Sequence, residues 1–294
     1  MFYRRKIILA LLQLFDYELE KIRLQKLLFL FTQRQQIGVY DFVPFKYGCY
    51  SFSANADLTA MANKGILIES ASHFKSNEKT DYFAVLKDPD KKILQEIKML
   101  YGRMNTDTLM KHTYINFPYW ATKSIKAESI LTAEELKKIN ESKPKGTKTI
   151  LFTIGYEGIS LEEYLNRLLK NDVKVLVDVR NNPLSMKYGF SKSLLKRNCE
   201  SLGIQYMHFP EVGIQSEHRQ ELNTQSDYDK LFEHYRSDIL SKMLTTQNTI
   251  LDILKQHKRI ALTCFEANIY QCHRKHLAEA LKSLPGFEYE VKHI

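Results

Sequence analysis

The chain has 294 residues, of which 44% are hydrophobic and 12% are aromatic, a composition that builds packed cores and excludes an intrinsically disordered protein. The length favours two domains over one. No apolar run reaches the ~20 residues that a membrane-spanning helix needs. No small-residue cleavage site follows the basic start of the chain, so we expect a cytoplasmic protein with no membrane contact. Four cysteines in a chain of this length are expected to be reduced thiols.

Positive charge is concentrated in the first half of the chain. The net charge of +9 divides into +7 for residues 1–146, with 23 basic and 16 acidic residues, and +2 for residues 147–294, with 20 and 18. Such an excess favours contact with a polyanion such as a nucleic acid. A lysine-rich solvated surface accounts for it equally well.

The start of the chain is predicted to form three helices. Apolar residues at helical spacing predict helices over 3–15 and 22–34. Ser51 or Ser53 can cap a third helix, and Gly65 suits the position just after its C-terminus.

A β-hairpin is expected after the third helix. GILIESASH (65–73) and TDYFAVL (80–86) are predicted to pair as strands around the polar turn KSNEK (75–79). Three short helices followed by a hairpin is the order of a winged-helix domain. The third helix, SFSANADLTAMANKG, contains no arginine and a single lysine, Lys64, so we do not expect it to read DNA bases directly.

Three stretches in this region resemble the winged-helix-like domain of the Panacea antitoxin and its relatives. They are IRLQKLLFLF (22–31), VPFKYGCYS (43–51) and a helix running into KGILIE (64–69). The resemblance covers roughly the first 75 residues. It implies a compact helical domain that contacts DNA, a protein partner or a second copy of the chain.

The join between two domains is predicted within TAEELKKINESKPKGTKT (132–149), where a helix ends and Ser, Lys, Pro and Gly follow. We therefore expect a mainly α winged-helix-like domain with further helices over 1–146, and an α/β domain over 147–294.

The second half alternates strands with helices. Its strands are nearly continuous apolar runs, as a sheet that is buried on both faces requires, and the alternation predicts a mostly parallel, Rossmann-like sheet with flanking helices. The predicted strands are KTILFTIG (148–155), KVLVDVR (174–180), IQYMHFP (204–210), RIALTCFE (259–266) and YEVKHI (289–294). The predicted helices are SLEEYLNRLLK (160–170), which Ser160 and Glu163 open as a capping box, SKSLLKRNCESLG (191–203), 227–245, 248–257 and QCHRKHLAEALKSL (271–284).

Polar residues follow four of these strands, and the carboxyl ends of parallel strands meet at one edge of the sheet, where ligands bind. They are GYEG (155–158), Asp178 with Arg180, Pro210 with Glu211 and Gly213, and Cys264 with Glu266. This convergence predicts an active site.

The first of these loops is a candidate anion-binding site. Gly155 and Gly158, with Tyr156 between them, flank a strand-to-helix turn whose backbone N–H groups can hold a phosphate. Glycine also simply permits a tight turn. Arg180 can bind a phosphate through two N–H groups, or it can neutralise Asp178 in a structural ion pair.

Asp178 and Glu266 are the candidate acid and base. Cys272, His273 and Arg274 lie in the first turn of a helix, where the dipole favours a reactive thiolate and bound anions, although a small buried cap residue suits position 272 as well.

A metal site is not expected from the cysteine spacing. Cys264 ends an apolar strand and is expected in the core. With Cys272 and His273 it matches no common zinc spacing, because two of the three ligands are adjacent in the chain.

Five motifs in order resemble the domain-of-unknown-function family numbered 488, over about residues 149–294. They are TIGYEGISLEEYL, VLVDVRNNP, GIQYMHFPEVG, CFEANIYQCHRKHLAEAL and VKHI. The resemblance implies a compact α/β domain with a pocket, and the family's recurring polar positions fall on Asp178, Arg180, Glu266 and 272–274. The chain departs from other members at Tyr156-Glu157, where they often carry His and Ser.

These observations lead to three functional hypotheses. The first is an enzyme that hydrolyses a glycosidic or phosphate ester bond of a nucleic acid or nucleotide without metal or cofactor. In it Asp178 or Glu266 activates water, Arg180 and Arg274 stabilise the anion, and His273 transfers a proton. The second is a non-catalytic DNA-binding regulator that senses an anionic ligand. The third is a protein-interaction module of a defence or toxin–antitoxin system.

Overall fold

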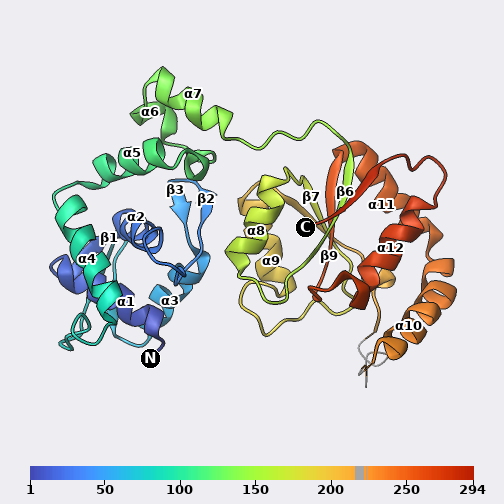
Figure 1. The fold of residues 1–294 in the computed structure, drawn as a ribbon, viewed down its shortest axis with the longest axis horizontal. Helices are drawn as coiled ribbons and strands as arrows, with labels where there is room; N and C mark the ends of the chain where they lie inside the picture. The colour runs from blue at the N-terminus through green and yellow to red at the C-terminus, as the bar shows by residue number, and fades with distance from the viewer. Residues whose placement is uncertain (216–221, 223) are drawn as a thin grey trace. The chain divides into compact units, whose positions relative to one another are not determined.

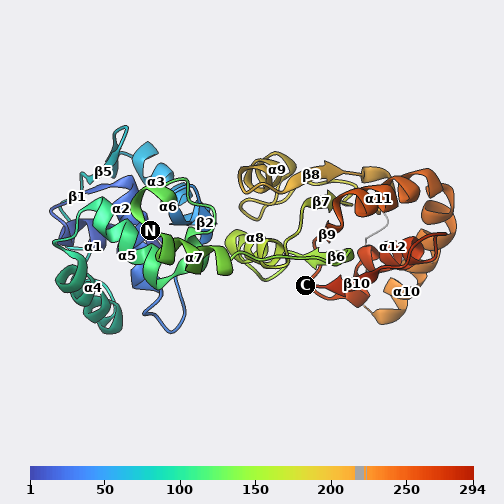
Figure 2. The same cartoon turned by 90° about the horizontal axis from the view of Figure 1, so that it is seen from above.

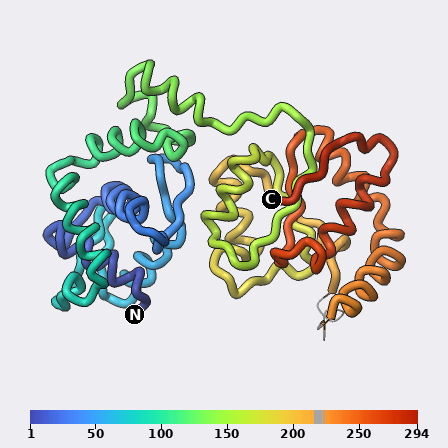
Figure 3. Tube along the Cα trace, in the orientation of Figure 1, coloured from blue at the N-terminus to red at the C-terminus, as the bar shows by residue number. Residues whose placement is uncertain are grey.

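The computed structural model describes residues 1–215, 222 and 224–294. Internal contacts divide the chain into two compact units, Met1–Lys143 and Pro144–Ile294, and Figure 3 traces the chain through each of them. Within the described residues, every helix is too short or too polar to cross a membrane.

The first unit is mainly helical, with small antiparallel sheets. Its elements are α1 Tyr3–Leu14, β1 Glu18–Glu20, α2 Lys21–Thr32, β2 Val43–Phe45, β3 Gly48–Tyr50, α3 Phe52–Asn63, β4 Leu67–Glu69, β5 His73–Ser76, α4 Asp88–Tyr101, α5 Thr106–Asn116, a 3-10 turn Pro118–Ala121, α6 Ala127–Ile130 and α7 Ala133–Glu141. The hairpin of β4 and β5 pairs back onto β1 in a sheet of order β1-β5-β4, and β2 pairs with β3.

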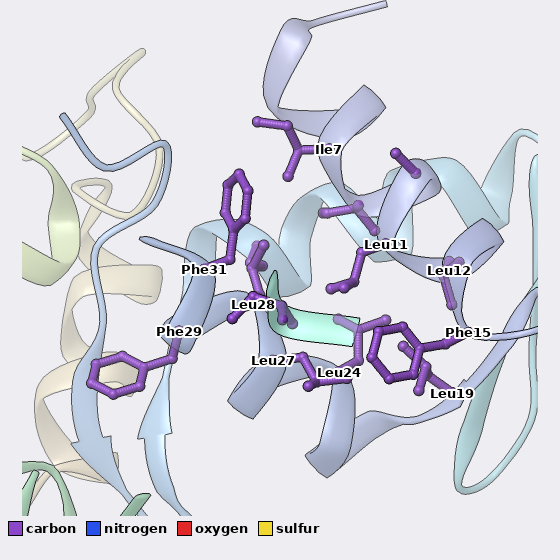
Figure 4. Packing of buried hydrophobic residues seen from close by; sticks show 14 of the residues in the cluster. Ile7, Leu11, Leu12, Phe15, Leu19, Leu24, Leu27, Leu28, Phe29 and Phe31 are labelled. Atoms are coloured by element: carbon purple, nitrogen blue, oxygen red, sulfur yellow. The ribbon is translucent and has the colours of Figure 1, made fainter. Parts of the chain in front are cut away.

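The core of this unit forms around α2, which is apolar on nearly every face and is buried from Leu24 onward. Leucines of α1 and α2 pack against each other (Figure 4), and Phe29 extends the core on the far side of α2. The ring of Phe29 packs edge-on against Phe42, Phe117 and Trp120 at centroid distances of 5.0 to 5.4 Å.

The third helix begins and ends as predicted. The Ser51 hydroxyl accepts a hydrogen bond from the Ala54 N–H, and Gly65 has a φ of +72°, which a glycine adopts without strain.

The predicted hairpin is wrong in its second strand. The strands are β4 and β5, so the turn lies at 70–72, and residues 80–86 form turns instead. Within that stretch the Asp81 carboxylate accepts hydrogen bonds from the Ala84 N–H and the Gln13 amide. This local bonding competes with strand pairing, while β5 gains β1 as a second partner.

The second unit has the predicted α/β fold. Its elements are β6 Ile150–Gly155, α8 Leu161–Lys170, β7 Val175–Asp178, α9 Lys192–Ser201, β8 Gln205–His208, a 3-10 turn Pro210–Val212, α10 Gln225–His234, a π-helical turn Tyr235–Ile239, a 3-10 turn Leu240–Lys242, α11 Leu244–His257, β9 Arg259–Cys264, a 3-10 turn Ile269–Gln271, α12 His273–Lys282 and β10 Glu290–His293. All five strands pair in parallel in the order β10-β6-β9-β7-β8.

Helices cover both faces of this sheet. In Figure 1, α8 and α9 lie on one face and α11 and α12 lie on the other, and Figure 2 shows the same two layers from above. The chain leaves β7 toward β8 at one side of the sheet, and leaves β9 through α12 toward β10 at the other side. These connections diverge from two adjacent strands, which is the topological switch point where ligands bind in open α/β sheets.

We predict that Phe29→Ala destabilises the first unit by about 3–5 kcal/mol, because it removes a fully buried ring and leaves a cavity. Urea unfolding followed by tryptophan fluorescence measures this directly, since the chain has one tryptophan, Trp120, which contacts the Phe29 ring. The control is Met99→Ala, whose side chain is 75% exposed and whose effect should stay within about 0.5 kcal/mol. Equal effects of the two substitutions would contradict this account of the core.

Candidate active site

A pocket of about 300 Å³ lies at the switch point, between the segments that follow β7 and β9. The segment after β7 contributes two consecutive amides, and β9 contributes its last residue. The lining residues are Tyr156, Arg180, Asn181, Asn182, Leu184, Ser185, Ile214, Cys264 and Phe265.

One wall of the pocket rests on a buried ion pair. Asp178 is fully buried and accepts two side-chain hydrogen bonds from Arg180, at 2.8 Å from Nε and 2.5 Å from Nη2. The Tyr206 hydroxyl donates a further bond to Asp178 at 2.6 Å. Burial disfavours the charged guanidinium, but the hydrogen bonds and the charge of Asp178 outweigh it and raise the pKa of Arg180.

The remaining contacts of Arg180 fix the aromatic side of the site. Its Nη1 donates to the Tyr156 hydroxyl at 2.9 Å and to the Phe190 carbonyl at 2.8 Å. The Tyr156 ring stacks on Phe190 at 4.2 Å and meets Phe265 edge-on. Of the two roles open for Arg180, these contacts favour the structural ion pair over phosphate binding, because its donors already point at protein acceptors.

The loop after β6 is shaped by a close approach to the loop after β9. A Cβ at Gly155 would lie 1.9 Å from the Glu266 carbonyl oxygen, so only glycine fits there. The N–H groups of Tyr156 and Glu157 both donate to the Phe265 carbonyl. Two of the N–H groups expected to hold an anion therefore bind protein instead.

The start of α8 also lacks the features of an anion-binding site. Two glutamates occupy its first turn, and Gly158, at a φ of +77°, is exposed and outside the pocket lining. The Ser160 side chain accepts a hydrogen bond from the Glu163 N–H as predicted, but the Glu163 carboxylate contacts Arg167. Negative charge at this helix terminus opposes a bound phosphate.

The end of β9, the loop after it and the start of α12 bring a thiol, a carboxylate and an imidazole together. The Cys264 Sγ lies 3.1 Å from Glu266 Oε2 and 3.6 Å from His273 Nδ1. Cys272 joins them, because the ligand atoms of the two cysteines and His273 all lie within 4.8 Å of one another. Glu266 is half-buried, whereas the other three are buried.

The hydrogen bond of His273 defines its tautomer. Its Nε2 lies 3.0 Å from the Val179 carbonyl oxygen, and a carbonyl can only accept, so Nε2 carries the proton. In the neutral imidazole, Nδ1 then carries the lone pair, and it lies 3.6 Å from Cys264 Sγ.

The surroundings of Cys272 oppose the reactive thiolate that its place at a helix start favours. Burial, then the neighbouring Cys264 and Glu266, raise the pKa of this thiol well above its ordinary value, and Arg274 only partly opposes them. Cys272 is the buried N-cap of α12, as the alternative of a small buried residue at a helix cap requires, and this place is also compatible with a ligand role.

Arg274 organises the loop after β9. It is 3% exposed, and its guanidinium donates to the backbone carbonyls of Glu266 and Ala267. Through these bonds it holds the peptide that carries the Glu266 side chain, which makes it a positioning residue.

Sequence reasoning missed several contributors to the site, among them Asn181, Asn182, Phe265 and Tyr206. Asn181 and Asn182 directly follow Arg180, and their place after a predicted strand was a usable signal. Cys264 was expected both at the active-site edge of the sheet and in the core, and it lines the pocket although it is 1% exposed. No sequence pattern indicated the contact of Tyr206 with Asp178, because this contact depends on the pairing of β7 with β8.

Residues 160–281 match the family described as "Domain of unknown function DUF488". The second unit is therefore similar to this family from the start of α8 to the end of α12. The matched range contains Asp178, Arg180, Cys264, Glu266 and 272–274, whereas the loop 155–158 precedes it. The chain matches none of the curated proteins.

We predict that Asp178→Asn destabilises the second unit by about 3–5 kcal/mol, because it leaves the buried Arg180 guanidinium without its counter-charge. Urea unfolding followed by far-ultraviolet circular dichroism should show the loss, while the Trp120 fluorescence transition of the first unit stays in place. The matched control is Asp252→Asn, at a carboxylate whose side chain is 76% exposed and 3.9 Å from Lys255. A stable Asp178→Asn protein would show that the pair does not support the fold.

Proposed function

We propose that the second unit is a hydrolase that acts at the base of a nucleotide or of a nucleic acid, with Glu266 as the group that activates water. The observation that supports this most directly is the contact between the Glu266 carboxylate and the thiol of Cys264, a residue that lines the pocket at the switch point. A carboxylate beside a pocket is suited to accept a proton from water and return it to a leaving group.

The size and lining of the pocket suit a single base. A volume of about 300 Å³ is at the lower end for small-molecule sites, and it is too small for paired bases. Phe265, which is 42% exposed, offers an aromatic surface for stacking. The Asn181 amide donates to the Pro210 carbonyl and the Asn182 amide oxygen accepts from the Leu184 N–H, so the opposite end of each amide can hydrogen-bond to a base. A nucleic-acid substrate would therefore present a base that has left the helical stack.

Cleavage of the glycosidic bond is favoured over cleavage of a phosphate ester. Stabilising a phosphoryl group calls for cationic donors aimed into the site. The donors of Arg180 are directed at Asp178, Tyr156 and Phe190, and two donors of Arg274 are directed at loop carbonyls. Departure of a base requires instead a proton donor and an activated water.

A mechanism with two catalytic carboxylates is not supported by the contacts of Asp178. Its oxygens accept bonds from Arg180 and Tyr206 beneath the pocket surface. We assign Asp178 a positioning role, in which it orients Arg180 and through it Tyr156. Glu266 then carries the acid–base chemistry.

We predict that Glu266→Gln lowers turnover by about 10²–10⁴-fold, because the amide cannot accept a proton from water. The assay measures release of free base from nucleoside monophosphates and from single-stranded oligonucleotides with plain and altered bases. The midpoint of thermal unfolding should change little, since Glu266 is only half-buried. Glu288→Gln, at an exposed position in the same unit, serves as the matched control. Unchanged turnover in Glu266→Gln would remove Glu266 from the mechanism.

We further propose that the first unit holds a nucleic acid through its phosphates. The excess of +7 over residues 1–146 supports an electrostatic contact. The order α1, β1, α2 and α3, with a hairpin paired to β1, supports the winged-helix interpretation. Lys64 is the C-cap of α3 and leads toward this hairpin. Because α3 itself carries no basic residue over Phe52–Asn63, the contact is expected to be independent of base sequence.

We predict that the full chain binds an oligonucleotide less tightly as salt rises. The logarithm of the binding constant should fall linearly with the logarithm of the salt concentration, with similar slopes for two unrelated sequences. Fluorescence anisotropy over a salt series measures the slopes. Lys64→Gln should reduce the magnitude of the slope by about one unit. Lys282→Gln, at an exposed lysine in the last turn of α12, should not. Affinity that does not respond to salt would argue against phosphate contacts.

A further inference from the structure

We propose that Cys264, Cys272 and His273 bind a zinc ion, whose fourth coordination position faces the pocket beside Glu266. The inference deepens the proposed function, on which it rests for the use of the metal but not for metal binding itself. The candidate ligands are two thiols and an imidazole, a set that selects zinc over the hard cations Mg²⁺ and Ca²⁺.

The spacing of the ligand atoms supports the site. The two Sγ atoms and one imidazole nitrogen lie within 4.8 Å of one another, and Cys264 Sγ lies 3.6 Å from His273 Nδ1. In a tetrahedral site with zinc–sulfur bonds near 2.3 Å and zinc–nitrogen bonds near 2.0 Å, neighbouring sulfur and nitrogen ligands are about 3.5 Å apart. The Cys264–His273 separation needs little adjustment, and the two sulfur atoms, about 3.8 Å apart in such a site, would need to close by at most about 1 Å.

The surroundings of His273 are those of a metal ligand. Its Nε2–H donates to the Val179 carbonyl, which fixes the ring and directs the Nδ1 lone pair to the cluster. A metal-bound histidine characteristically donates its other N–H to a carbonyl or carboxylate in this way. The carbonyl belongs to the residue that follows β7, so the sheet itself orients the ligand.

Charge and burial agree with a cation at this place. All three ligands are buried, at 0–1% exposure. Two thiolates would neutralise a divalent ion, so the three ligands and the ion would have no net charge. Burying this neutral group costs less free energy than burying any of its charges separately. Metal binding would release the two thiol protons to solvent.

The linear spacing of the residues hides this site. Cys272 is in an extended conformation with φ −129° and ψ 132°, and His273 begins a helix, so the side chains of these neighbours leave the backbone in different directions. Cys264 reaches them from the end of β9, because α12 starts directly above that strand end. Cys272 and His273 are adjacent in the sequence, which argues against a zinc site there. In the fold this adjacency does not prevent both side chains from binding one ion.

Three protein ligands suggest a catalytic rather than a structural zinc, because structural sites have four. Cys264 also lines the pocket, which places the fourth position on the substrate side. Bound zinc would supply a hydroxide-like water near neutral pH. Glu266 Oε2, at 3.1 Å from Cys264 Sγ, lies where it can exchange a proton with that water.

The test uses the full chain, purified without chelator, and zinc and cobalt ions as probes. Elemental analysis should find about one zinc ion per chain. Titration of metal-free protein with Co²⁺ should give thiolate charge-transfer absorption together with the intense visible bands of a tetrahedral site. Cys264→Ser, Cys272→Ser and His273→Gln should each weaken zinc binding by at least the 10–100-fold that is typical for loss of a second-shell partner. Cys199→Ala, which changes a buried cysteine of α9 outside the cluster, should retain the ion.

The outcomes separate this inference from the proposed function. Failure of the wild-type protein to take up Zn²⁺ or Co²⁺, or a Cys264–Cys272 disulfide in freshly purified protein, overturns the metal site whatever the variants do. Stoichiometric zinc with no base release leaves the metal site standing and overturns the hydrolase. Base release that is undiminished in metal-free protein leaves the hydrolase and overturns the catalytic role of zinc.

Discussion

The geometry of the site depends on the close approach of two loops at the carboxyl edge of the sheet. The Glu266 carbonyl occupies the space where a side chain at position 155 would begin, and Arg274 donates to the same carbonyl. The loop after β6 adds two N–H groups that bind the Phe265 carbonyl. The short segment that carries Phe265 and Glu266 is therefore bonded on both sides. A single carboxylate can act as an acid–base group only if it is held in this way, because misplacement by about 1 Å costs a large part of the rate.

Charged groups divide between those that build the pocket and those that are available for chemistry. Asp178 and Arg180 neutralise each other beneath the surface, and their remaining contacts fix Tyr156 and Tyr206. Such a pair stabilises the fold less than its short distances suggest, because desolvation offsets much of the attraction. Its value lies in orientation: it fixes the positions of an aromatic wall and of the segment that begins at Asn181. Glu266 is left as the half-buried carboxylate next to a pocket-lining residue.

The sequence was sufficient for the fold of the second unit but not for the assembly of its site. Nearly continuous apolar strands and intervening helices predict a parallel sheet, and the five strands lie where they were expected. Strand order could not be predicted, because β9 enters between β6 and β7 only through long-range packing. The neighbours of Cys264 depend on that order. Its burial was predicted correctly, and at the end of a central strand it also lines the pocket.

The first unit shows how charge counts in a sequence overstate the charge that a partner meets. Arg4 and Arg5 both donate to the carboxylate of Asp57 in α3, and the Tyr40 hydroxyl donates to the same group. Burial alone would raise the pKa of Asp57, but these bonds lower it, so the carboxylate stays charged and ties α3 to the start of α1. Two of the basic residues near the chain start are consequently used inside the unit. The one acidic side chain of α3 is bound in this way, and α3 has no basic residues of its own. It therefore offers few side chains that could hydrogen-bond to base edges. Any hold on a polyanion must then come from the other basic side chains of the surface, which favours contact with phosphates regardless of sequence.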